Sequence, residues 1–190
     1  LNYGDVAVIK YYMTNEDVGI YNAAYQLFNV IANFSFVISS YYASSVSSNF
    51  ANNNYKKIKY FFYKERFFIC LIAVLGHILI IIISKPTILF LYGEEYSKSV
   101  TILNILLMGS LIKYFTVFYM LYYNTNGKHR IQQTINILVA IVNVGLSILF
   151  INIFGLNGPA IATVVTLLLS LVYSFYYCEK RIRIFIKKSY

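Results

Sequence analysis

The sequence predicts an all-helical membrane protein, a bundle of helices that crosses a bilayer several times. Of its 190 residues 59% are hydrophobic and 12% are charged, whereas a soluble domain is about 25% charged. The apolar residues gather into runs long enough to span a bilayer, and most of the Lys and Arg residues lie between these runs. This composition excludes an ordinary soluble globule and leaves no room for a soluble catalytic domain.

Six apolar segments follow one another along the chain. The first, residues 1–13, is too short to cross a bilayer and too apolar for a loop, so we expect it to be part of a helix of a longer protein. The other five contain 17 to 24 residues. As helices they would extend about 25 to 36 Å, close to a hydrocarbon core of about 30 Å. These five segments are residues 19–42, 67–83, 100–123, 131–154 and 156–177, and a basic tail follows at 178–190.

Basic residues favour every second connection between these segments. One set of connections, with the tail, holds twelve Lys and Arg residues, whereas the other set holds two, Lys85 and Lys98. Because short cytoplasmic loops are enriched in Lys and Arg, we expect a cytoplasmic C-terminus. Residues 55–66 alternate aromatic and basic side chains, as an interfacial helix over anionic lipid would. The net charge of +9 therefore indicates a membrane surface and not nucleic acid.

Polar residues inside the spans are the candidates for function, because each costs free energy unless it faces a cavity or a partner. In the segment 19–42, Asn22, Gln26, Asn29 and Asn33 fall within an arc of about 60°. Amides can donate and accept hydrogen bonds with sugar hydroxyls, so we favour a wet cavity along this stripe. The alternative is that these amides hold packed helices together.

Three charged residues also lie within apolar segments. Lys113 is close to the middle of 100–123, where a lysine costs about 2.5 to 3.5 kcal/mol on insertion scales. It is expected to meet an anionic headgroup such as a diphosphate, or else to extend toward the interface. Asp5 and Lys10 are about 140° apart around a helix and form no simple ion pair. Asp5 could pair with another helix or bind a coupling cation or proton, and Lys10 could bind substrate or anchor the outer interface.

Other polar side chains are assigned packing roles. A lone His77 on an apolar helix is more often a hydrogen-bonded packing residue than a proton carrier. Two stripes of small or amide residues are assigned to close helix packing: Gln132, Asn136, Asn143 and Ser147, and then Thr163, Thr166, Ser170 and Ser174. The sequence lacks the motifs of hydrolases, metal sites and phosphate-binding loops. We therefore expect no enzyme activity, no cofactor and no metal site.

The chain resembles the C-terminal half of bacterial polysaccharide-export flippases, in the superfamily of multidrug, oligosaccharidyl-lipid and polysaccharide exporters. The resemblance covers essentially the whole chain. It rests on the run Asp5 to Lys10 with the following Glu16 to Ala24, on Leu91 to Tyr96, on Thr125 to Lys128, and on Phe154 to Thr163. Pro159 departs from the pattern, which more often has a small residue there, and should stiffen the start of the last helix.

The resemblance implies a bacterial inner-membrane protein of about twelve helices in two lobes of six. This chain would be the second lobe without the beginning of its first helix, and its partners would be the first lobe and other polysaccharide-assembly membrane proteins. Such proteins flip undecaprenyl-diphosphate-linked oligosaccharides by alternating access, for O-antigen (lipopolysaccharide) or capsule synthesis. The expected substrate-binding residues are Asn22, Gln26, Asn29, Asn33, Lys113 and Lys10, with Asp5 in ion coupling.

Two alternatives remain open. A multidrug antiporter of the same superfamily would hold carboxylates for organic cations, yet the five complete spans contain no Asp or Glu. A membrane enzyme of the same pathway, such as an oligosaccharide polymerase, would need a larger catalytic loop outside the membrane. The predicted outer loops are too short for one.

Overall fold

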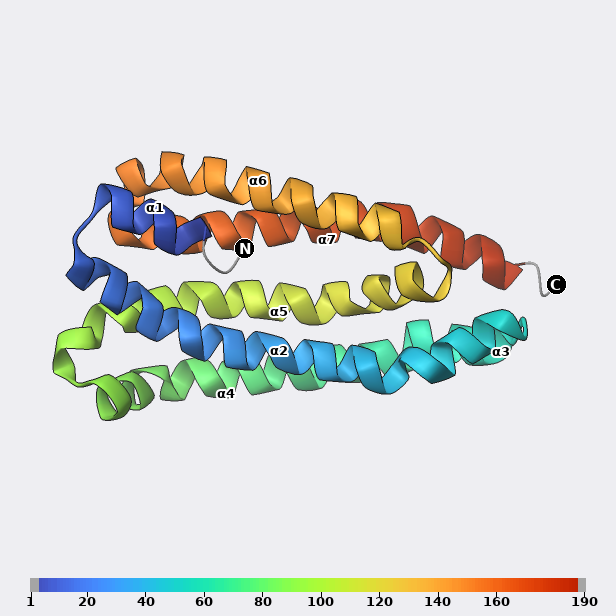
Figure 1. Ribbon diagram of the computed structural model, residues 1–190. Helices are drawn as coiled ribbons and strands as arrows, with labels where there is room; N and C mark the ends of the chain where they lie inside the picture. Colours follow the sequence, from blue (N-terminus) through green and yellow to red (C-terminus); the bar gives the residue numbers. More distant parts are fainter. Residues whose placement is uncertain (1–3, 188–190) are drawn as a thin grey trace.

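The chain folds into an elongated bundle of long helices (Figure 1). The computed structural model describes residues 4–187, and this range contains helices and turns but no strand. The prediction of an all-helical protein is therefore confirmed for the described part of the chain. The helices are α1 (Gly4–Tyr12), α2 (Asn15–Ala51), α3 (Tyr55–Tyr60), α4 (Arg66–Tyr92), α5 (Ser97–Thr125), α6 (His129–Phe154) and α7 (Gly158–Lys187). A π-helical turn, Phe61–Glu65, joins α3 to α4, and 3₁₀ turns at Glu94–Tyr96 and Gly155–Asn157 precede α5 and α7.

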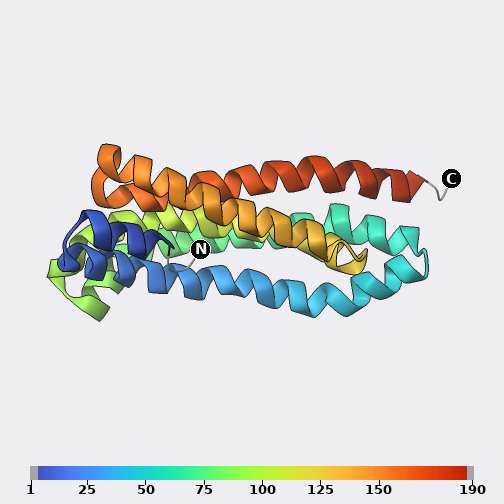
Figure 2. The ribbon, with the colours of Figure 1, turned by 45° about the horizontal axis from the view of Figure 1, so that its top comes forward.

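Helix α5 lies at the centre of the bundle, where it packs against α2, α4 and α7. The short α1 packs between α6 and α2 near one end (Figures 1 and 2). The apolar core consists of two clusters. One contains Tyr21, Phe28 and Leu106, and the other contains Phe118 and Tyr123 together with residues of α3, α4 and α7.

The connections sort to the two ends of the bundle. Helix α3, the turn between α5 and α6 and the C-terminus of α7 lie at one end, which we call the basic end (Figure 1). The other three connections, α1 to α2, α4 to α5 and α6 to α7, lie at the opposite end. This is the arrangement that the alternating basic connections require. Lys85 and Lys98 belong to the opposite end, near the turn at Glu94–Tyr96.

Several helices extend past the predicted segments. Helix α2 begins at Asn15 because Thr14 and Asp17 form a reciprocal capping box, in which the Asp17 amide donates to Thr14 Oγ1 at 3.2 Å. Helix α4 continues through Pro86 to Tyr92 and ends at Gly93, whose φ of +93° suits glycine. Residues 55–66 form no separate interfacial helix, because they run into α4 through the π-helical turn.

The expected tail, 178–190, is helical as far as residue 187 and continues α7. Ile182 and Ile186 are four residues apart on one helix face and are buried in the second core cluster. Their burial stabilises the extension of α7 beyond the apolar run. The last three residues, 188–190, lie outside the described part of the chain.

Three segments of the described chain are long and apolar enough to cross a membrane: Tyr55–Tyr92, Glu94–Thr125 and His129–Ile186. The third is 58 residues long and contains α6 and all but the last residue of α7. Helix α2 is not among them, because amides and serines occupy much of its surface. Large apolar side chains such as Phe67, Ile72 and Phe90 are exposed on the outer surface of α4. Because exposing so large an apolar surface to water is unfavourable, these features indicate a membrane protein.

A partly buried ionic network joins three helices at the basic end. Arg66 of α4 forms an ion pair with Glu179 of α7 at 2.7 Å. The Tyr119 hydroxyl of α5 donates to Glu179 and accepts from Arg66, each at 3.2 Å. Arg183 approaches Glu179 only to 3.9 Å and is exposed.

Candidate functional site

A polar cleft of about 420 Å³ opens between α2 and α6, with α5 and α7 forming its floor. Asn33 and Phe36 of α2 lie on one wall, and Gln132 and Asn136 of α6 lie on the other. The cleft is located where the two core clusters meet, since Ala32 of the first and Val117 of the second both line it. Its floor contains Lys113, Thr116 and Met120 from α5 and Leu167, Ser170 and Ser174 from α7.

Lys113 contributes a positive charge to this cleft. Its Nζ lies 4.9 Å from the centre of the Phe28 ring, a cation–π contact. Phe28 is level with Gly109, one turn before Lys113 in α5, so the amine points away from the basic end and does not snorkel toward Tyr122. Within residues 4–187 it forms no ion pair with a carboxylate. The ring stabilises the ammonium without neutralising it, which leaves the charge available for an anion.

The amide stripe of α2 is only partly gathered at the cleft. Gln26 and Asn33 are exposed, and Asn22 and Asn29 are half-buried, so none of the four is sealed inside a helix contact. Asn33 lines the cleft together with Lys113, whereas the other three lie farther along α2 toward the opposite end and do not line it. Lys10 is exposed on α1 and is also not part of the cleft.

Four residues assigned to helix packing prove to line the cleft: Gln132 and Asn136 of α6, and Ser170 and Ser174 of α7. Gln132 and Asn136 lie four residues apart on α6 and face Asn33 across the opening. Gln132 and Asn136 have the same helical spacing as the amides of α2, so the sequence did indicate that they share one face of α6. The amides of two helices that are distant in sequence thus face one cavity.

Asp5 is the centre of a second polar cluster, and it is only 1% exposed. Its carboxyl group accepts hydrogen bonds from Tyr21 Oη at 3.0 Å, Ser147 Oγ at 3.0 Å and Thr163 Oγ1 at 2.7 Å. Asn143 donates to Asp5 at 2.9 Å when its side-chain amide is oriented so that the nitrogen faces Asp5 and the oxygen faces the Thr163 hydroxyl. Four helices therefore meet at this one carboxyl group, which we call the Asp5 cluster.

Among residues 4–187 the hydrogen-bond partners of Asp5 are neutral donors on other helices, and Lys10 is not one of them. The described residues include no group of three or more His, Cys, Asp or Glu side chains that could hold a metal ion. Asn143 and Ser147 continue the polar face of α6 on which Asn136 lies. Asn143 is two turns, or about 10 Å, beyond Asn136. One polar face of α6 therefore extends from the cleft to the Asp5 cluster.

His77 is buried and has the packing role that its isolated position favoured. Its Nδ1 lies 2.7 Å from the carbonyl oxygen of Ala73, and its Nε2 contacts the Ser110 hydroxyl of α5. Both ring nitrogens are therefore satisfied within the bundle.

A family model described as "polysaccharide biosynthesis protein" matches residues 1–101, just over half of the chain. The match includes Asp5, Lys10 and the amides of α2 and ends before Lys113. No curated protein and no solved structure matches the chain.

Proposed function

The chain belongs to the polysaccharide biosynthesis protein family, and on that premise we propose that it is part of a flippase for undecaprenyl-diphosphate-linked oligosaccharides. The protein would move these repeat units across the bacterial inner membrane for O-antigen or capsule synthesis. The observation that carries the proposal is the cleft, in which an unneutralised lysine lies between two walls that bear amides. We propose a transporter and not an enzyme.

The cleft offers different groups to the two polar parts of this substrate. A diphosphate in a medium of low dielectric constant needs a nearby positive charge, and Lys113 supplies one. The sugars need donors and acceptors at several positions, which Asn33, Gln132 and Asn136 provide. Phe36, whose side chain is 63% exposed at the edge of the cleft, offers an apolar face for a sugar ring. In the part of the chain that the structure describes, no Asp or Glu lines the cleft, which disfavours an organic cation as the substrate.

In this proposal the basic end faces the cytoplasm, because positively charged connections are retained there. The bundle is the second lobe of a protein of about twelve helices, and the first lobe closes the cleft on its open side. Alternating access then consists of rocking one lobe against the other around the bound headgroup. Further partners would be other membrane proteins of polysaccharide assembly.

Asp5 is the proposed site of ion coupling. A proton or cation that binds there changes the hydrogen bonds of Tyr21, Ser147 and Thr163 at once, and these residues belong to three different helices. Because α6 also forms one wall of the cleft, a change in its packing at Asp5 would reach the substrate directly. This gives ion binding a mechanical route to the cleft.

Cells in which the full-length gene is deleted and replaced by variants provide the test. The deletion should accumulate undecaprenyl-linked repeat units inside the cell, and the wild-type gene should clear them. Lys113→Ala should fail to clear them, whereas Lys98→Ala, which removes a lysine outside the cleft, should behave as wild type. Full clearance by Lys113→Ala would remove the headgroup role. Sensitivity to organic cations without accumulation would indicate the antiporter instead.

A further inference from the structure

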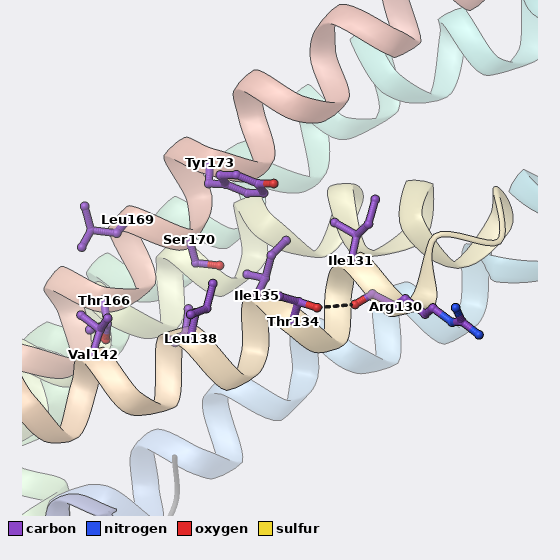
Figure 3. A pocket seen from close by; sticks show the side chains of 11 residues that line it. Arg130, Ile131, Thr134, Ile135, Leu138, Val142, Thr166, Leu169, Ser170 and Tyr173 are labelled. Carbon is purple, nitrogen blue, oxygen red and sulfur yellow. Dashed lines mark hydrogen bonds between the residues drawn. The ribbon is translucent and has the colours of Figure 1, made fainter.

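A second cavity lies on the outer surface of the bundle between α6 and α7. It has a volume of about 430 Å³ and is lined mainly by aliphatic side chains (Figure 3). Leu138 and Val142 of α6 face Leu169 and Tyr173 of α7 across it, and Arg130 lies at its end (Figure 3). Leu138 and Leu169 are each 56% exposed. We call this cavity the α6–α7 groove.

The groove exists because α6 and α7 diverge. The two helices begin together at their connecting turn, where Gly158 allows their backbones to meet, and they separate toward the basic end (Figure 2). Val142 is twelve positions after Arg130 on α6, so the groove extends about 18 Å. This is more than half of a hydrocarbon core of about 30 Å.

Most of the surface of the groove is apolar, and its two threonines add little polarity. The Thr134 hydroxyl donates to the carbonyl oxygen of Arg130 at 3.0 Å, and the Thr166 hydroxyl donates to the carbonyl oxygen of Ala162 at 2.9 Å. Because both hydroxyls are satisfied by their own helices, they make no demand on a ligand. The groove therefore suits a long hydrocarbon chain.

The groove and the polar cleft are adjacent. Ile135, Val139 and Ser170 line both cavities, so the same side chains form the wall between them. One cavity offers a positive charge and amides, and the other offers aliphatic surface. A molecule with an anionic head and a hydrocarbon tail matches the pair, whereas an ordinary phospholipid with its headgroup at Arg130 would leave Lys113 and the cleft unused.

We propose that the α6–α7 groove binds the polyprenyl chain of the lipid whose diphosphate occupies the polar cleft. This inference rests on the proposed function and adds a separate site for the tail. The tail would remain at the membrane-facing surface of α6 and α7 while the head passes through the cleft. Filling the groove should therefore weaken lipid binding without altering the charge of the cleft.

Photolabelling of the full-length protein in nanodiscs tests this. The probe is a polyprenyl diphosphate with a diazirine in its chain, and mass spectrometry maps the labelled residues. We expect the labels to lie on residues of the groove. Leu138→Trp and Leu169→Trp should each weaken binding of the probe about tenfold, because the larger side chain would exclude roughly two methylenes of the polyprenyl chain. Ile137→Trp is the matched control, because Ile137 is 61% exposed on α6 but does not line the groove.

Three outcomes would overturn the inference. The labels could lie on other parts of the bundle, or Ile137→Trp and Leu138→Trp could weaken probe binding equally. In the third outcome a diazirine-bearing phosphatidylglycerol labels the groove equally well and is not displaced by excess polyprenyl diphosphate. Size-exclusion profiles that match wild type show that the variants are folded. If Lys113→Ala blocks clearance in cells while the groove stays unlabelled, this inference alone fails. Absence of accumulation in the deletion strain would instead count against the flippase.

Discussion

Gly158 permits a close approach between the backbones of α6 and α7, and replacing it with alanine should separate them. A Cβ at this position would lie against the carbonyl group of Phe150 and 2.6 Å from the amide nitrogen of Ile151. Real Cβ atoms do not approach other atoms closer than 3.0 Å. The obstructing atoms belong to the backbone of α6, so no side-chain rotation can relieve the overlap.

The size of the effect follows from this geometry. The backbones must separate by at least about 0.8 Å, because the Ile151 nitrogen at 2.6 Å must move to the 3.4 Å at which ordinary van der Waals contact begins and the Phe150 carbonyl group is closer still. If that movement reached Thr163, its 2.7 Å hydrogen bond to Asp5 would lengthen beyond the usual limit of about 3 Å. Overpacking costs about 1–3 kcal/mol, and losing a hydrogen bond to a charged group costs about 1.5–3 kcal/mol. We expect Gly158→Ala to lower the free energy of unfolding by about 3–5 kcal/mol.

Unfolding of the purified full-length protein by SDS in mixed micelles measures this change. Gly145→Ala is the matched control, because Gly145 lies on α6 with nothing within 4 Å of an added Cβ. In a helix interior alanine is favoured over glycine by up to about 1 kcal/mol, so the control should be neutral or slightly stabilised. Equal stabilities for Gly158→Ala and Gly145→Ala would refute the close approach of α6 and α7.

Three further predictions concern the polar groups. Asp5→Asn replaces the carboxyl group by an amide of nearly the same volume that cannot ionise. Transport, measured with and without an ion gradient, should then no longer depend on that gradient. An unchanged dependence would exclude Asp5 from coupling. Glu179→Gln leaves Arg66 without its counterion and should destabilise the protein by about 2–4 kcal/mol in the SDS titration. Arg183→Gln, at an exposed pair, should cost less than about 1 kcal/mol, and equal effects would contradict the role of burial. Asn136→Leu should reduce clearance of lipid-linked repeat units, whereas Asn152→Leu, outside the cleft on the same helix, should not.

The sequence predicted the helices α4 to α7 well because each contains a hydrophobic run bounded by polar residues. It predicted their ends less well, because the ends depend on tertiary contacts. Ile182 and Ile186 belong to a basic segment that resembles a tail, and only their burial against other helices explains why α7 continues. The extension of α4 through Pro86 is another such case, since a membrane helix tolerates proline when its surroundings satisfy the backbone.

The candidate site was partly predictable. Periodicity identified the amide stripe of α2, but it could not show that Asn33 alone would share the cleft with Lys113. The partners of Asp5 could not be found at all from local pattern, because Ser147 and Thr163 are 142 and 158 residues away in the sequence. Gln132 and Asn136 were assigned to packing because periodicity identifies a polar face without showing what that face contacts.

Reconstitution of the full-length protein in liposomes tests the central claim most directly. A fluorescent undecaprenyl-diphosphate-linked oligosaccharide is placed in both leaflets, and a membrane-impermeant reductant then quenches the outer pool. We predict that wild-type protein exposes the inner pool to quenching, and that Lys113→Ala does so no faster than liposomes without protein. Equal rates for wild-type protein and protein-free liposomes, or for wild type and Lys113→Ala, would contradict the account.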